Sequence, residues 1–368
     1  MNEQPKISLI DALHLRQTFD AVKAKTVPHH RASIWYYFGG LALFFFIVQV
    51  VTGILLLFYY EPTTEAAYKS VQKIITQVPF GWLIRSLHSW SANALVLMVF
   101  VHMFSAFLMK AYRAPRRIMW VTGVILLLLI LGFGFTGYLL PWDETAYFAT
   151  KIGTEVPKAL PIIGETVSSL IKGANDVNGA TLTRMFALHA GVLPALSILL
   201  VLVHIGMIML FGSSSPPETK LRGETRYFPN YLIKEMMVWL FGFAILILVA
   251  VLYPWGIGHA YDLANPTEPP AGIHPEWYFM FLFQTLKIVP EWVVIIGFGV
   301  VAIIWTLIPW LDKRANQNKR SPVFTIIGIV AILYMCVMTT WAYISVSQEQ
   351  REVPTSGQVK TTDSTNAK

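Results

Sequence analysis

Long apolar stretches separated by polar segments recur along almost the whole chain of 368 residues. Each stretch is long enough to cross about 30 Å of hydrocarbon as an α-helix. The pattern therefore predicts an all-α integral membrane protein with seven transmembrane helices. The predicted spans are 34–60, 84–109, 118–140, 186–211, 236–254, 292–311 and 322–345.

The polar segments suggest a division of the chain into units. A Ser- and Pro-rich segment follows Gly212 and is typical of a flexible linker. The long connection 141–185 is predicted to carry short helices on the membrane surface. The predicted division is a polar arm, 1–33, a four-helix unit, 34–212, a linker, 213–235, a three-helix unit, 236–346, and a disordered tail, 347–368.

Composition and charge support a membrane environment. Hydrophobic residues make up 55% of the chain and charged residues 13%, against about 25% charged residues in soluble domains. Of the 28 Lys and Arg residues, 17 lie in the N-terminal arm and the loops after the second, fourth and sixth spans. The positive-inside rule then places the N-terminus in the cytoplasm and, after seven crossings, the C-terminus outside. The net charge of +7 is thus attributed to membrane topology and not to nucleic acid binding.

Four histidines lie inside the apolar spans as two pairs. His88 and His102 are 14 residues apart, and His189 and His204 are 15 apart. On helices these intervals correspond to about 21 to 23 Å along the axis. A single histidine there would usually be a hydrogen-bonded structural residue, but ionisable groups inside membranes are costly and tend to mark function. Two matched pairs favour axial ligands, so we predict that His88 faces His189, that His102 faces His204, and that each pair binds the iron of a non-covalent haem b.

Glycines repeat the histidine interval on the neighbouring spans. Gly39 and Gly53 are 14 residues apart in the first span, and Gly123 and Gly137 are 14 apart in the third. A glycine lets a porphyrin approach the helix backbone, although small residues are also common packing sites in membrane helices. The repeated interval favours the cofactor.

One arginine lies shortly before the first histidine in each of the two spans. Arg85 lies one turn before His88, and Arg184 lies five residues before His189. Haem propionates need cationic partners, whereas a snorkelling arginine would contact lipid headgroups. We expect Arg85 to bind a propionate and Arg184 to be structural or adjacent to the haem.

A second chemical signal follows the fifth span. Pro275, Glu276, Trp277 and Tyr278 precede a short apolar segment. A carboxylate and a phenol at the membrane edge are suited to accept protons from a hydroquinone. The two aromatic residues are equally typical of an interfacial aromatic belt.

Cys336 is the only cysteine in the chain. This count excludes internal disulfides, a CxxCH haem attachment site and a cluster ligated by cysteines of this chain. Any iron–sulfur partner must therefore be another polypeptide.

These residues together resemble cytochrome b of the quinol-oxidising cytochrome bc complexes, the Rieske/cytochrome b family, over about residues 27–340. The 15-residue histidine interval and Pro141-Trp142-Asp143 are similar to the cytochrome bf branch, where a four-helix cytochrome and a three-helix subunit IV are commonly separate chains. This chain resembles the two fused. The motifs that carry the resemblance are 275–278 (PEWY), 81–85 (GWLIR), 136–138 (TGY), 141–142 (PW) and 182–184 (LTR).

The resemblance implies roles for these residues. His88 and His189 would ligate an outer, low-potential haem, and His102 and His204 an inner, high-potential haem. Glu276 would accept a proton from quinol in an outer pocket. Other residues expected in that pocket are Pro275, Trp277, Tyr278, Trp142 and Ala149, with the surface helix after Trp142 as its other wall.

The resemblance also implies a function and partners. The chain would be the core of a proton-translocating quinol oxidoreductase in a bacterial cytoplasmic membrane, active only with partner subunits and dimeric. One electron would pass to a Rieske iron–sulfur protein and then to a c-type cytochrome or equivalent acceptor, and the other across both haems to a quinone. A dihaem membrane anchor shares the histidines but not the PEWY motif. A transporter explains the spans but not the paired histidines.

Three positions depart from the family pattern. Tyr37 occupies the place of the cysteine that anchors an extra haem c in the bf branch, and Met209 replaces an arginine near that haem. We therefore predict no covalent haem c, while a loosely bound third haem stays an open alternative. Ala149 stands where many respiratory relatives have glycine, so its methyl group predicts weak inhibition by methoxyacrylate-type quinol analogues.

Overall fold

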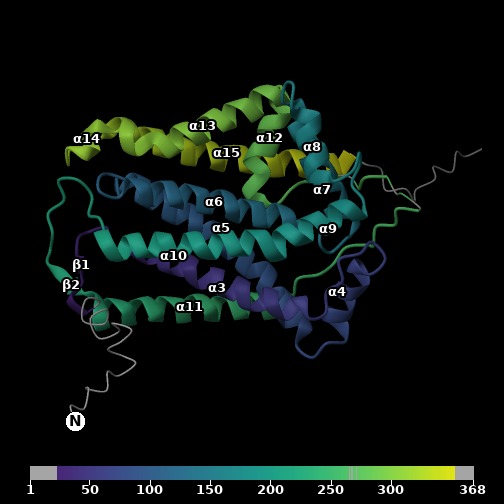
Figure 1. The fold of residues 1–368 in the computed structure, drawn as a ribbon, viewed down its shortest axis with the longest axis horizontal. Helices are drawn as coiled ribbons and strands as arrows, with labels where there is room; N and C mark the ends of the chain where they lie inside the picture. The colour runs from purple at the N-terminus through teal and green to yellow at the C-terminus, as the bar shows by residue number, and fades with distance from the viewer. Residues whose placement is uncertain (1–22, 265, 267, 271, 353–368) are drawn as a thin grey trace, which may run out of the picture.

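A computed structural model describes residues 23–264, 266, 268–270 and 272–352. Its long helices lie side by side, and their connections gather at the two ends of the bundle (Figure 1). Seven helical stretches within the described residues are long and apolar enough to cross a membrane. The predicted all-α, seven-span fold is confirmed.

The four-helix unit consists of α3, α5, α6 and the continuous stretch from α9 to α10. α3 packs along α5, and α10 packs along α6. Buried apolar side chains such as Phe45, Leu95 and Ile130 fill the space between them. The helix bounds are Tyr37–Leu57 for α3, Gly81–Leu108 for α5, Arg117–Tyr138 for α6, Gly179–Ala187 for α9 and Leu193–Phe211 for α10, with the π-helical turn η3 at Leu188–Val192.

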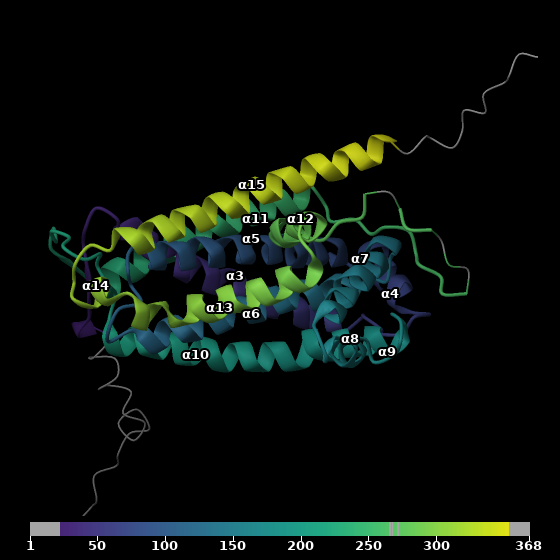
Figure 2. The same ribbon diagram turned by 90° about the horizontal axis from the view of Figure 1, so that it is seen from above.

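The C-terminal helices cover this unit from outside. α11 packs on α3 and α5, α13 on α6, and α15 on α12 and α5. Seen from above, α15 and α10 lie at opposite edges of the molecule (Figure 2). The bounds are Leu232–Leu252 for α11, Met280–Ile288 for α12, Glu291–Leu311 for α13, Lys313–Asn316 for α14 and Pro322–Glu352 for α15, with the 3-10 turn η5 at Trp277–Phe279.

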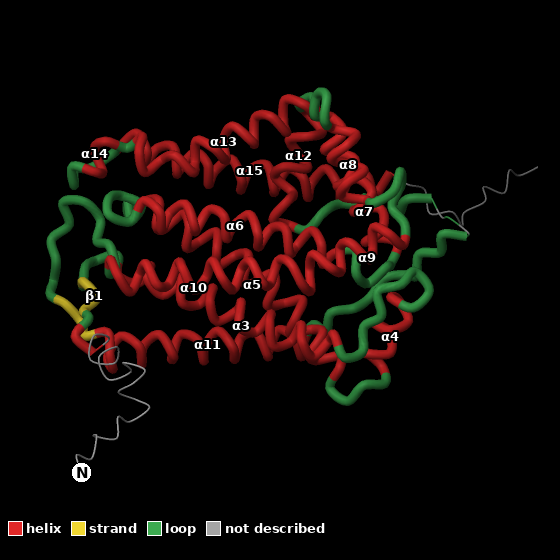
Figure 3. Tube along the Cα trace, viewed as in Figure 1, coloured by secondary structure: helices red, strands yellow, loops and turns green. Residues whose placement is uncertain are grey.

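The two ends of the bundle differ in structure (Figure 3). Short helices gather at one, which we call the surface-helix end, and a two-stranded antiparallel sheet lies at the other, which we call the strand end. In that sheet Val27 pairs with Thr225. The surface-helix end contains α4 (Ala67–Thr76), α7 (Glu144–Glu155), η2 (Val156–Ala159) and α8 (Gly164–Lys172), and the strand end contains β1 (Thr26–Pro28), η1 (Ser33–Tyr36), β2 (Glu224–Arg226) and η4 (Tyr227–Tyr231).

The linker predicted at 213–235 is more ordered than its composition suggested. Its β2 strand pairs with β1, and Arg113 donates a hydrogen bond of 2.7 Å to the Ser215 carbonyl. Arg116 also donates to the carbonyls of Phe211, Gly212 and Ser213. Contacts with residues distant in sequence therefore hold a segment that local composition marks as flexible.

Two other boundaries also need correction. The fourth span begins at Gly179 rather than 186, because Asn178 and Thr181 form a capping box at its start. α15 continues through 347–352, which were predicted to be disordered. The remaining tail, 353–368, and the first part of the polar arm, 1–22, lie outside the described residues.

Candidate functional site

The four histidines meet as the two predicted pairs, between α5 on one side and η3 and α10 on the other. The ring centroids of His88 and His189 are 6.3 Å apart with an interplanar angle of 72°, and those of His102 and His204 are 6.4 Å apart at 82°. A metal ion about 2 Å from one nitrogen of each of two opposed imidazoles places the centroids about 6 Å apart. Each pair therefore has the spacing for one iron. α5 begins next to α4, so His88 and His189 form the surface-end pair and His102 and His204 the strand-end pair.

The π-helical turn η3 explains the unequal histidine intervals. In continuous α-helices, intervals of 14 and 15 residues would end about 100° apart around the axis. Pro194 has no N–H to donate to the preceding turn, and a π-helical turn holds one residue more than an α-helical turn. His189 lies inside this turn, at Leu188–Val192. The wider turn accommodates the extra residue, so both histidines of the fourth span reach their partners on α5.

Three of the histidines are held by a threonine at Nδ1. Each threonine hydroxyl donates to a carbonyl of its own helix, so its oxygen is free to accept the imidazole N–H. This contact fixes the tautomer and leaves the Nε2 lone pair for a metal. The Oγ1–Nδ1 distances are 2.9 Å from Thr52 to His88, 3.0 Å from Thr122 to His204 and 3.2 Å from Thr136 to His189.

Each of the four predicted glycines lies against one histidine. A Cβ added at Gly137 would be 2.5 Å from Cε1 of His189, and one at Gly39 would be 2.8 Å from Cε1 of His102. At Gly53 and Gly123 the corresponding distances, to His88 and His204, are both 3.4 Å. The glycines thus make room for the imidazoles themselves, as well as for a group between them.

The donor set fits a haem. Among the described residues, no group of three or more His, Cys, Asp or Glu side chains is placed to hold a metal ion. Each site therefore offers two imidazoles and no further protein ligand from those residue types. Each pair of imidazoles would hold the iron of one haem, which needs no third ligand from these residue types.

The two arginines have protein partners. Arg85, only 7% exposed, donates to the carbonyls of Trp255 and Gly256 at 2.6 and 2.8 Å and so ties α5 to the segment after α11. Arg184 donates to the Leu170 carbonyl of α8. Both contacts are structural, and propionate binding by Arg85 stays a prediction.

A cavity of about 180 Å³ lies at the surface-helix end between α6, α7 and α12. Glu276 and Pro275 line it from one side, and Ala149 of α7 lines it from the other. Burial raises the pKa of Glu276 above its usual value, and nearby His274 opposes that rise. A carboxyl group with a raised pKa, facing an apolar cavity, is suited to receive a proton.

The aromatic residues predicted for this pocket lie around it rather than in its wall. Trp142, 1% exposed, is packed under the surface helices with Tyr147. Trp277 turns toward α5 and donates to Asn93 Oδ1 at 2.8 Å. Tyr278 is buried in the bundle core with its hydroxyl against Gly134, which does line the cavity. Buried indole and phenol groups need hydrogen-bond partners or close packing. Trp142, Trp277 and Tyr278 find these away from the cavity and therefore do not line it.

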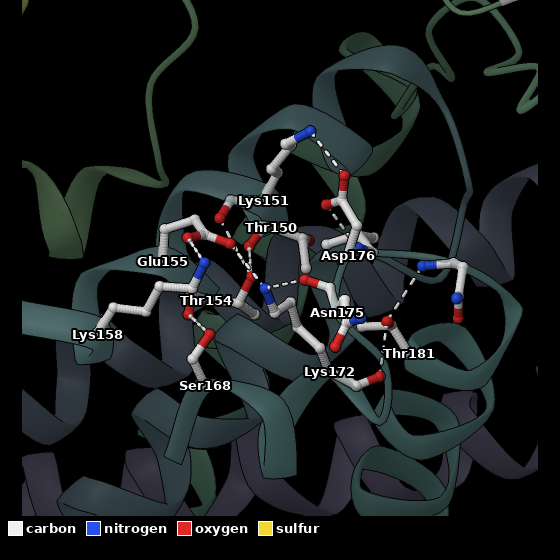
Figure 4. Close-up of polar contacts among 12 residues, drawn as sticks. Thr150, Lys151, Thr154, Glu155, Lys158, Ser168, Lys172, Asn175, Asp176 and Thr181 are labelled. Atoms are coloured by element: carbon white, nitrogen blue, oxygen red, sulfur yellow. Dashed lines mark hydrogen bonds and ion pairs between the residues drawn. The ribbon is translucent and has the colours of Figure 1, made fainter. Parts of the chain in front are cut away.

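A polar network holds the α7 wall in place (Figure 4). Lys172 of α8, almost fully buried, donates to Glu155 Oε1 and to the Asn175 carbonyl, both at 2.7 Å. The Ser168 hydroxyl donates to the Thr154 carbonyl at 2.8 Å. These bonds fix α7 on α8, and with it the position of Ala149.

Several site residues were missed from the sequence. The three threonines occur as Thr-Gly dipeptides at 52–53, 122–123 and 136–137, and this recurrence is a signal that a search could use. The fourth glycine, Gly39, follows Phe38 instead. Phe135 and Tyr138 of α6 and Thr150 of α7 also line the cavity. Tyr138 belongs to the TGY motif at 136–138, whereas nothing in the local pattern distinguishes Phe135 or Thr150.

Comparisons with known proteins show the family to which the chain is similar. The chain matches the family model "Cytochrome b/b6/petB" over residues 22–212 and "Cytochrome b(C-terminal)/b6/petD" over 263–362. It is 48% identical over 342 residues to a cytochrome bc complex cytochrome b subunit of Chlorobaculum thiosulfatiphilum, covering 90% of this chain and 79% of that one. It is 48% identical over 206 residues to cytochrome b6 of Cyanidium caldarium, covering 56% and 95%. The fold is similar to that of a chain in a hyperthermophilic respiratory Complex III, with a TM-score of 0.73 and 24% identity, covering 93% of this chain and all of that one.

Proposed function

This chain belongs to the cytochrome b family and is a membrane subunit of an electron-transferring quinol oxidoreductase complex of the bc type, and on that premise we propose that its histidine pairs bind two haems b stacked across the membrane. The observation that supports this proposal most directly is the nearly equal distance between ring centroids in the two pairs, 6.3 and 6.4 Å. The pairs lie 14 residues apart on α5, which corresponds to about 21 Å.

Bound haem would supply one-electron transfer. The chain's own residues set the conditions for it. Thr52, Thr122 and Thr136 orient their imidazoles, and the glycines leave room for the rings. The apolar core of the bundle excludes water from the space between the helices. Electrons would pass along the bundle from the surface-end pair to the strand-end pair.

Quinol would be oxidised in the cavity at the surface-helix end. Glu276 would accept a proton from a quinol hydroxyl, and the apolar residues of the α7 wall would position the ring. Because its pKa is raised, the Glu276 carboxylate is a stronger base than an exposed glutamate. It is competent only when deprotonated, so its contribution grows as pH rises through that pKa.

The remaining parts of the proposal concern topology and partners. One of the two quinol electrons would go to a Rieske iron–sulfur protein and then to a c-type cytochrome or equivalent acceptor, and the other would cross the two histidine pairs. The lysine- and arginine-rich strand end would face the cytoplasm of a bacterial cell, with a quinone-reduction site near the strand-end pair. The active complex would be a dimer, as membership of this family suggests.

Single-ligand variants test the haem assignment. His189→Leu should remove only the surface-end haem and His204→Leu only the strand-end haem, measured by reduced-minus-oxidised spectra and haem content of the purified complex. Variants that keep both spectral components would refute the assignment. Oxidant-induced reduction of haem b, with the quinone-reduction site blocked, would separate a bifurcating core from a simple dihaem anchor.

A further inference from the structure

His274 is a second proton-accepting side chain in the wall of the cavity at the surface-helix end. It lines this cavity beside Glu276, and Tyr138 of α6 is the remaining titratable side chain of the described lining. A phenol is a poor proton acceptor near neutral pH, whereas an imidazole both accepts and releases a proton there. His274 precedes the PEWY motif and has no part in the role proposed for Glu276.

The local backbone decides which ring nitrogen of His274 is basic. Its Nδ1 lies 2.8 Å from the carbonyl oxygen of Pro275. A carbonyl oxygen only accepts hydrogen bonds, so Nδ1 of the neutral ring carries the hydrogen and donates it. The lone pair on Nε2 is then left to take a proton. The imidazole is therefore held in one tautomer with a defined basic atom.

The position of His274 connects the cavity with the outside of the bundle. Its ring meets the ring of Tyr343 edge to face, with the centroids 5.8 Å apart and an interplanar angle of 72°. Tyr343 belongs to α15, which packs on α12 as it runs toward the surface-helix end (Figure 2). Tyr343 is 43% exposed, and polar residues follow from Ser345 onward. The partly exposed imidazole thus has the cavity on one side and the edge of α15 on the other.

The last turns of α15 hold the segment that carries His274. Lys287 of α12 pairs with Glu349 at 2.6 Å. A Cβ added at Gly272 would be 2.5 Å from Cγ of Gln350, so the chain just before His274 lies directly against the helix. These contacts keep the imidazole beside α15 and the charges of the neighbouring ion pair satisfied by each other.

The proposed chemistry leaves Glu276 with a proton that it must lose before the next quinol arrives. Burial raises the pKa of Glu276 above its usual value, so the carboxyl group tends to keep that proton. A positive charge on His274 acts in the opposite direction on this pKa. A base within reach of Glu276, with access to water on its other side, would remove the proton.

We propose that His274 is this relay, which takes the quinol-derived proton from Glu276 and releases it at the exposed edge of α15. The inference rests on the quinol oxidation proposed for this cavity. The O–H bond of the Glu276 carboxyl group breaks and an N–H bond forms at Nε2 of His274, directly or through one water molecule. The imidazolium then gives the same proton to bulk water. Both side chains return to their starting states, and no electron moves in either step.

The experiment measures steady-state quinol oxidation by the whole purified complex. The test variant is His274→Asn, because the amide keeps an N–H donor for the Pro275 carbonyl but has no basic nitrogen. The matched control is His259→Asn, since His259 is exposed at the same end and does not line the cavity. The reduced-minus-oxidised haem spectrum of each variant checks assembly.

His274→Asn should lower kcat by on the order of tenfold and change KM little, because loss of the relay slows the reset of Glu276 and not the binding of quinol. His259→Asn should behave like the wild type. The double variant of Glu276→Gln with His274→Asn should be no slower than Glu276→Gln alone, because the relay acts only on a proton held by Glu276.

Chemical rescue separates a relay from a structural role. His274→Ala should be slow and should recover turnover with millimolar imidazole, which supplies the missing base, whereas Glu276→Gln should not recover. If His274→Asn does not assemble, the His274→Ala series decides by itself, and failure of imidazole to restore turnover overturns the proposal.

The same assay distinguishes failure of the relay from failure of the proposed function. Wild-type kcat in His274→Asn beside slow turnover in Glu276→Gln would overturn the relay and leave quinol oxidation at this cavity standing. Wild-type turnover in both variants would overturn the relay together with the role proposed for Glu276.

Discussion

The surface-end and strand-end histidine pairs have nearly the same ring spacing but different surroundings. At the surface end, both imidazoles contact a threonine hydroxyl, through Thr52 and Thr136. At the strand end only His204 does, through Thr122. In the described structure, His102 has the ring-facing Gly39 beside it, and the residue before that glycine is Phe38.

This difference distinguishes the features proposed to bind a haem from those proposed to set its redox potential. Ring spacing and a glycine against each ring are common to both pairs, so we expect haem binding to depend on these two features. A hydroxyl acceptor at Nδ1 makes an imidazole a stronger donor and favours the oxidised iron. If haems bind as proposed, two such contacts at the surface end and one at the strand end would favour a lower potential at the surface end, which is the direction that would drive electrons toward the strand end.

The largest effect is expected from glycine substitutions. Gly137→Ala would place a methyl group 2.5 Å from Cε1 of His189, whereas Gly53→Ala would leave 3.4 Å to Cε1 of His88. A ring held by iron cannot move away, so Gly137→Ala should lose the surface-end haem and Gly53→Ala should keep it. Haem content per purified chain measures this. Equal haem content in the two variants would contradict the proposal that Gly137 makes room for the His189 ring.

The next effect concerns Glu276, the proposed proton acceptor at the surface-helix end. Glu276→Gln should lower quinol oxidation by on the order of tenfold or more. The wild-type rate should rise as pH increases through the raised pKa of Glu276, and the variant should lack that rise. Glu291→Gln, an exposed carboxylate at the start of α13, is the control. A pH profile that is the same in Glu276→Gln and wild type would remove Glu276 from this role.

A smaller effect is expected from the wall of the same cavity. Ala149→Gly removes the methyl group that narrows the space opposite Glu276. The inhibition constant for a methoxyacrylate-type compound should fall by about tenfold, which corresponds to about 1.4 kcal/mol and is within the range for one added or missing methylene. Turnover without inhibitor should change little. Unchanged inhibition would show that Ala149 does not limit access.

The smallest effect tests the threonines. Thr52→Val keeps the shape of the side chain and removes the acceptor for His88 Nδ1. The midpoint potential of the surface-end haem should rise by about 20 to 60 mV, since 59 mV corresponds to a tenfold change in a one-electron equilibrium. The strand-end potential should stay the same. Redox titration followed at both haem bands measures the two, and a shift confined to the strand-end haem would reverse the assignment of the pairs.

The regularities that sequence analysis detected are those repeated along single helices. Apolar length predicted the seven spans, because a membrane demands about 20 apolar residues per crossing. The intervals between histidines and between glycines predicted which residues share a level of the bundle, since a helix has a fixed rise per residue. Glu276 followed from a local motif. None of these inferences needed a contact between distant segments.

Contacts between distant segments decided the rest. Trp142 and Trp277 are excluded from the cavity wall by partners far away in the chain, and the linker is held by β1 and by arginines of the α5–α6 loop. A cavity at the strand end is lined from four parts of the chain, at 31, 108–110, 216–222 and 314–326. Hydropathy and helical periodicity are properties of a few consecutive turns, so they can be recognised from the sequence alone. The pairing of particular side chains depends on how separate helices pack, and only the tertiary structure determines it.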